Sequence, residues 1–142
     1  MAKIEWEDSL SVGIDLIDEQ HKMLIQRLSD LSKAVEQQRA PSEVLKTLDF
    51  LVEYTDFHFS TEEKHMVEQE YAGRHYHLQQ HEEFKDSLRH LVEDFEDEGA
   101  TKALGTAINI MLLNWLINHI KGIDVKFGEF LKDKGMIDIN EA

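Results

Sequence analysis

Hydrophobic positions recur along the chain at intervals of three and four residues, and this spacing predicts amphipathic helices. One stripe runs through Leu24, Leu28 and Leu31, and similar stripes follow in three further segments. The stripe of the last of these segments includes Leu104, Ile108, Met111 and Leu112. Alternating apolar and polar runs, the pattern typical of strands, do not occur. The helices that the pattern predicts cover residues 18–38, 41–68, 74–99, 101–121 and 124–134.

Short breaks separate these segments. Pro41 suits the first turn of the second helix, Tyr71–Ala72–Gly73 supplies a turn, and Gly99 closes the third helix. Gly122 is expected to interrupt the fourth helix before the short last one. Asp15 and Asp18 are candidates for the residue that caps the first helix.

The first fourteen residues show no helical period and are expected to form an arm over apolar surface. Four long helices joined by connections of a few residues favour neighbours that run in opposite directions. We therefore predict one all-α domain over residues 1–142, an antiparallel up-down-up-down four-helix bundle with an N-terminal arm and a short C-terminal helix. The apolar residues of the arm are Ile4, Trp6, Leu10, Val12 and Ile14.

Composition excludes several functions. The net charge of −14 argues against nucleic acid and against an anionic membrane surface, since both attract basic proteins. The chain has no cysteine, which excludes disulfides, thiolate metal ligands and thiol catalysis. The N-terminus lacks a basic region followed by an apolar run, so a cytoplasmic location is expected.

Residues 103–120 carry no formal charge and come close to the length of a membrane span. Asn109, Asn114 and Asn118 would be costly in hydrocarbon, however. A helix buried among other helices, without membrane insertion, explains the segment better.

Polar residues that bind metals continue the apolar stripes. His58 and Glu62 lie four residues apart, as do His77 and His81, so each pair falls about 40° apart on one helix face. A bare carboxylate on a buried face is costly unless it is paired or bound to a metal. Six such groups on the inward stripes of four helices therefore predict a metal site, whose candidate ligands are His21, His58, Glu62, His77, His81 and His119, with Asp124 close by.

The number of candidate ligands indicates more than one ion. Five histidines that donate once and two carboxylates that bridge would make nine bonds, too many for a single ion. Two six-coordinate ions joined also by a solvent-derived oxygen would keep one position open, where a small ligand could bind. Ligand type suits iron, zinc, copper or nickel, and iron leads because structural zinc prefers four ligands.

These residues resemble the motifs of the hemerythrin family over nearly the whole chain. The segment from Gly13 to His21 is similar to the opening motif of the family. His58 to Glu62 resembles its HxxxE motif, His77 to His81 its HxxxH motif, and His119 to Asp124 its HxxxxD motif. The chain departs from many relatives in having Ala72, not proline, after Tyr71.

The resemblance implies a non-heme di-iron centre, oxo- or hydroxo-bridged, that binds O₂ reversibly for transport, storage or delivery. It implies that His77, His81 and His119 hold one iron, that His21 and His58 hold the other, and that Glu62 and Asp124 bridge them. Apolar residues at family positions would line the O₂ pocket and exclude water, namely Leu24, Phe59, Trp115, Leu116 and Ile120. His65, His75 and His90 are outside the ligand positions, and we expect His65 to be partly exposed and His90 to be solvated.

Other functions share the same site. An O₂, redox or NO sensor would act through a separate partner protein, which the sequence does not identify. A di-iron oxidase, peroxidase or NO-handling enzyme would need a proton donor near the open iron, where the expected residues are apolar, so we favour binding over catalysis. NO and small anions are alternative ligands of the open iron. Iron storage is disfavoured because ferritin-like sites are rich in carboxylates.

Overall fold

We analysed a computed structural model of the chain, which describes residues 5–136. This part of the chain is helical throughout, apart from short connections, and no strand occurs in it. The prediction of an all-α four-helix bundle is confirmed. The elements are η1 (Asp8–Leu10), α1 (Asp15–Glu36), α2 (Pro41–Glu68), α3 (Arg74–Glu98), α4 (Lys102–Ala107), η2 (Ile108–Leu113), α5 (Asn114–His119), η3 (Ile120–Asp124) and α6 (Val125–Asp133).

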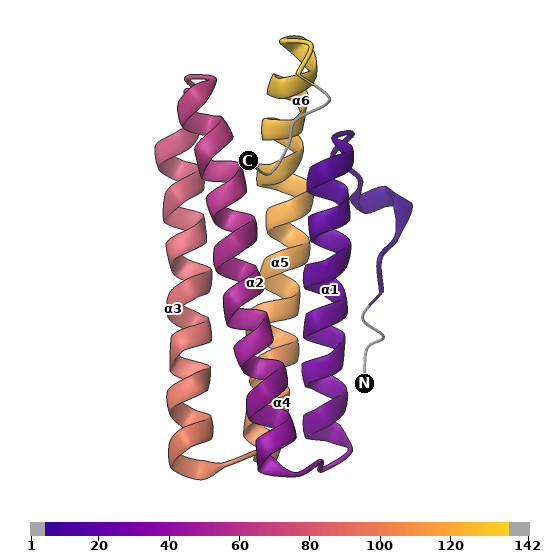
Figure 1. Cartoon of the computed structure of the whole chain (residues 1–142), viewed down its shortest axis with the longest axis vertical. Helices are drawn as coiled ribbons and strands as arrows, with labels where there is room; N and C mark the ends of the chain where they lie inside the picture. Colours follow the sequence, from indigo (N-terminus) through magenta and orange to yellow (C-terminus); the bar gives the residue numbers. More distant parts are fainter. Residues whose placement is uncertain (1–4, 137–142) are drawn as a thin grey trace.

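Four long rods run up and down in turn, and each connection lies at an end of the bundle (Figure 1). The fourth rod is continuous from α4 to α6 and includes two π-helical segments, η2 and η3. Gly122 was predicted to interrupt this rod, and that prediction is wrong. The backbone stays helical through η3 into Val125, because packing of α6 onto the core outweighs the cost of about 1 kcal/mol for a helical glycine.

The first helix begins three residues earlier than predicted, at Asp15. Asp18 does not cap it, and its carboxylate instead binds the arm. That carboxylate accepts hydrogen bonds from the Ser11 hydroxyl at 2.5 Å and from the Val12 amide at 2.8 Å. The arm lies beside α1 (Figure 1), where Leu10, Val12 and Ile14 are buried as expected; Ile4 falls outside the described residues.

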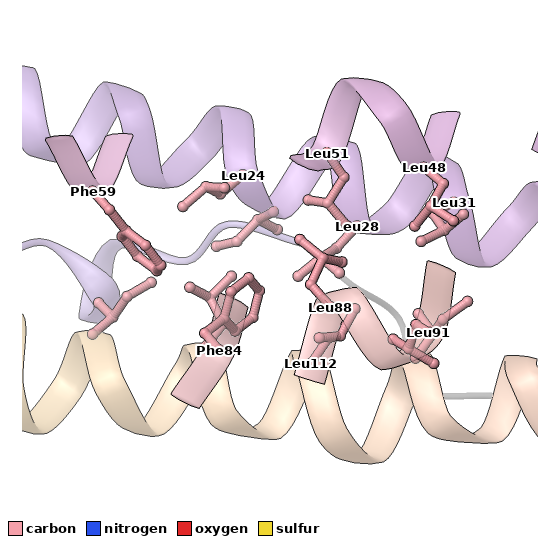
Figure 2. Packing of buried hydrophobic residues seen from close by; sticks show 14 of the residues in the cluster. Leu24, Leu28, Leu31, Leu48, Leu51, Phe59, Phe84, Leu88, Leu91 and Leu112 are labelled. Atoms are coloured by element: carbon pink, nitrogen blue, oxygen red, sulfur yellow. The ribbon is translucent and has the colours of Figure 1, made fainter. Parts of the chain in front are cut away.

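The apolar stripes meet in the centre of the bundle. Figure 2 shows side chains of α1, α2, α3 and η2 pointing toward one another, among them Leu28, Leu51, Leu88 and Leu112. The predicted stripes of the first three helices are all buried. In the fourth helix the prediction is wrong for Met111, which is 44% exposed, because neighbouring residues differ by about 100° and Leu112 occupies the inward position.

One helix, Lys102–Asp133, is long and apolar enough to cross a membrane by length and composition alone. Its inward face packs against α1 and α3 as the fourth rod of the bundle. Core helices of soluble proteins pass the same test, so it carries little weight.

Candidate metal centre

Each long helix contributes side chains to one buried cluster. α1 provides His21, and α2 provides His58 and Glu62. The i, i+4 spacing within α2 and within α3 points both members of each pair inward, as expected from the sequence. α3 provides His77 and His81, and the fourth rod provides His119 and Asp124.

The π-helical segment η3 brings Asp124 to the cluster. His119 and Asp124 are five residues apart, and in a regular α-helix this spacing would separate them by about 140°. Hydrogen bonds of a π-helix join residues i and i+5, so η3 places both side chains on the same face. His119 Nε2 lies 3.1 Å from Asp124 Oδ1 as a result.

The donor atoms form two groups that share two carboxylates. One group contains three histidines and the other contains His21 and His58, and the donor atoms within each group lie within 4.8 Å of one another. Asp124 reaches both groups, since its Oδ2 is 2.9 Å from His21 Nε2 and its Oδ1 is 2.8 Å from His77 Nε2. Glu62 Oε1 is 3.3 Å from His58 Nε2 and 3.2 Å from His81 Nε2.

The cluster has the chemistry of a metal site. All seven residues are buried, and none is more than 2% exposed. Apart from the short contacts that they make with one another, the Nε2 atoms of the five histidines and both oxygens of Glu62 and Asp124 have no hydrogen-bond partner among the described residues. Unpartnered buried polar atoms of this number are costly, and cations between them would satisfy them. Nitrogen and carboxylate oxygen are suitable donors for iron and related metals.

Burial and mutual charge set the protonation of the cluster. Burial lowers the pKa of His58 to about 3, so its ring is neutral. Burial would raise the pKa of Asp124, but the charges of His119 and His21 hold that pKa well below its usual range. Burial would also lower the pKa of His81, but the Glu62 and Glu63 carboxylates raise it to about 9. A metal bound by His81 would therefore displace a proton.

Two residues that the sequence analysis did not single out as functional position the ligands. The Oε1 atom of Gln20 lies 2.7 Å from His58 Nδ1, and the Oε2 atom of Glu63 lies 2.8 Å from His81 Nδ1. Each acceptor holds a proton on Nδ1, which leaves Nε2 free to face the centre. Gln20 lies in the segment that resembles the opening motif of the family, and Glu63 follows the candidate ligand Glu62, and these positions were the available signals.

Two of the five expected pocket residues, Phe59 and Trp115, stack on histidine rings of the centre. Phe59 stacks on His81 with ring centroids 3.8 Å apart and lies 5.7 Å from His58. Trp115 stacks on His119 at 4.5 Å and is only partly buried. The other three expected pocket residues, Leu24, Leu116 and Ile120, are buried in the core.

The remaining histidines lie outside both donor groups. His90 is exposed, as expected. The prediction for His65 is wrong, because its side chain is buried and its Nδ1 lies 3.8 Å from Glu68 Oε2. His75 lines a shallow surface depression with Glu82.

Fold and site together define an antiparallel four-helix bundle with a buried metal centre rich in histidine and carboxylate. A family model described as "Hemerythrin HHE cation binding domain" matches residues 12–131. The chain belongs to the hemerythrin family.

Individual relatives agree with this assignment. A bacteriohemerythrin from Stenotrophomonas maltophilia is 35% identical, and the match covers 93% of this chain and 84% of that protein. A myohemerythrin from Sipunculus nudus is 36% identical, with 86% and 88% covered. A crystal structure of a hemerythrin point mutant superposes with a TM-score of 0.81 at 25% identity, and covers 91% of this chain and 97% of its own.

Proposed function

We propose that this chain binds O₂ reversibly at a non-heme di-iron centre and serves as an oxygen carrier or store. The observation that supports this most strongly is the pair of buried donor groups that share Glu62 and Asp124. Shared carboxylates are what two neighbouring ions need as bridges. Membership of the hemerythrin family supports iron as the metal.

Each donor group would hold one iron. The group of three histidines has more nitrogen donors than the group of two, so the second ion would keep an open position. Two ferrous ions, when bound, supply the electrons and the coordination position that O₂ binding requires. The assignment is that His77, His81 and His119 hold one ion, His21 and His58 hold the other, and Glu62 and Asp124 bridge them.

The remaining task of the chain is to keep water and protons away from the bound ligand. Phe59 and Trp115 cover the rings of His81 and His119. Leu24, Leu116 and Ile120 would complete an apolar wall. Apolar side chains cannot act as general acids or bases, which favours binding over catalysis.

The visible absorption spectrum of the anaerobically reduced protein tests this function. Iron charge-transfer bands should appear when air is admitted and should fade under argon, with two irons per chain. Bands that appear but do not fade would refute reversible binding and favour a di-iron oxidase or another redox role. A protein that holds two metals per chain without developing colour would refute iron as the metal.

A further inference from the structure

The outward surface of the fourth rod differs from that of the other three. From Ala103 to Ile120 the sequence carries no charge, whereas the exposed positions of α1, α2 and α3 include many Lys, Asp and Glu residues. Ile110 is 59% exposed and Met111 is 44% exposed. We define the outer face of the fourth rod by its exposed residues, Ala103, Thr106, Ile110, Met111, Asn114 and Asn118.

A groove of about 480 Å³ runs beside Ile110. Val35 and Glu36 of α1 lie on one side, and Lys102, Gly105 and Thr106 of the fourth rod lie on the other. Asn109 also lines the groove, and its Oδ1 atom is buried with no hydrogen-bond partner in the described part of the chain. Its amide nitrogen donates to the Gly105 carbonyl at 3.1 Å. The groove therefore has a mixed apolar and polar lining and one free acceptor.

We propose that the outer face of the fourth rod is the contact surface for a second copy of this chain, paired across a two-fold axis near Ile110. The pairing would be isologous, because Ile110 would meet Ile110 of the second copy at the axis and the groove beside Thr106 of each copy would face Asn114 of the other. Two copies with a net charge of −14 repel one another over most of their surface. An uncharged face is the surface on which that repulsion is smallest.

Charges at the ends of the face favour antiparallel rods. A parallel pair would place Lys102 against Lys102 and Lys121 against Lys121. An antiparallel pair centred on Ile110 instead places Lys121 beside the turn at Gly99, which follows the acidic run 96–98. The same register places Ala103 opposite Ile117 of the second copy.

The size of the face indicates a weak dimer. Ala103 and Asn118 are about 22 Å apart along the helix, so one rod and its flanks bury less than a standard interface. We expect a dissociation constant on the order of micromolar or weaker. The contact would also cover Met111 and approach the partly buried Trp115, one turn further along, so the second copy would screen the outer side of the metal centre.

Sedimentation velocity of the full chain, from about 5 to 500 µM, tests the proposal. Wild type should shift from monomer to dimer, and Ile110→Glu should stay monomeric because it buries a charge in the contact. Val67→Glu is the matched control, since Val67 is 55% exposed on α2, and it should dimerise like wild type. Circular dichroism of each variant checks its fold. A wild type that stays monomeric throughout, or equal loss in both variants, would overturn the proposal.

Cross-linking tests the register, because the natural chain has no cysteine. Packed helices 8–10 Å apart bring facing Cα atoms within disulfide range. A mixture of Ala103→Cys and Ile117→Cys should oxidise mainly to the mixed dimer. A103C joined chiefly to itself would overturn the antiparallel pairing. A monomer that floats with neutral phospholipid vesicles would show that lipid, not a second copy, covers the face. None of these readouts needs iron, so they can fail independently of the proposed O₂ binding.

Discussion

The hydrogen bond between Gln20 and His58 gives a direct test of how the centre is organised. Gln20 is 1% exposed, and its amide nitrogen lies 3.5 Å from the Thr61 hydroxyl, which itself donates to the Phe57 carbonyl at 3.0 Å. This contact turns the amide oxygen of Gln20 toward His58 Nδ1. The imidazole is thereby fixed in the tautomer whose Nε2 accepts a metal.

Gln20→Leu removes the acceptor and replaces the amide with an apolar side chain of comparable volume. Loss of an outer hydrogen bond to a metal-binding histidine lowers affinity by about 10- to 100-fold, which corresponds to about 1.4 to 2.8 kcal/mol. Because His58 belongs to only one donor group, the loss should fall on one of the two ions. The metal-free protein should also lose about 1 to 3 kcal/mol of unfolding free energy, since Nδ1 is left buried without a partner.

Anaerobic titration of the metal-free protein with Co²⁺, monitored by visible absorption and by calorimetry, separates the two binding steps. Gln20→Glu is the first control, because it retains an oxygen acceptor and should bind both ions tightly. Thr61→Val is the second control, and it should have a smaller effect because the contact it removes is long. Two unchanged binding steps in Gln20→Leu would refute the positioning role, as would an equal loss in Thr61→Val.

Three further predictions concern the arm, the pocket and the metal. A Cβ at Gly128 would lie 2.4 Å from the Val12 carbonyl oxygen, so Gly128→Ala should lower the unfolding free energy measured in urea by about 1 to 3 kcal/mol. Gly122 has open space around it, so the control Gly122→Ala should leave the unfolding free energy unchanged or raise it. Trp115→Ala and Ile120→Glu should admit water and speed decay of the oxygenated spectrum about tenfold, equivalent to about 1.4 kcal/mol of barrier; decay at the wild-type rate would contradict the pocket assignment. For an ion whose free concentration is 100 times its dissociation constant, removal with a chelator should lower the unfolding free energy by about 2.7 kcal/mol. The helix content measured by circular dichroism should not change.

The helical stripes were predictable because burial follows the helical period directly. His21, Leu24 and Leu28 lie on one face by spacing alone, and the structure buries all three. The same rule placed the histidines of α2 and α3 on inward faces. It failed for Met111, at the edge of its stripe, where the angular position does not decide between core and solvent.

The features that sequence could not supply depend on contacts between helices or on backbone geometry. The HxxxxD motif named His119 and Asp124 as ligands, but helical spacing alone would have turned Asp124 away from His119, and the π-helical segment brings them together. Gln20 and Glu63 are ordinary polar residues until the packing of α1, α2 and α3 sets each beside an imidazole nitrogen. Local periodicity contains no information about either arrangement.

The ligand residues of the centre lie between apolar layers that hold the helices on both sides of them. Toward one end of the bundle lies the layer of Leu28, Leu51 and Leu88 (Figure 2). Toward the other end, Met66 and Phe127 are fully buried. Burial of such side chains contributes about 1.5 to 3 kcal/mol each, which offsets the cost of the polar cluster between the layers. We therefore expect these two layers to keep the bundle folded when the metals are removed.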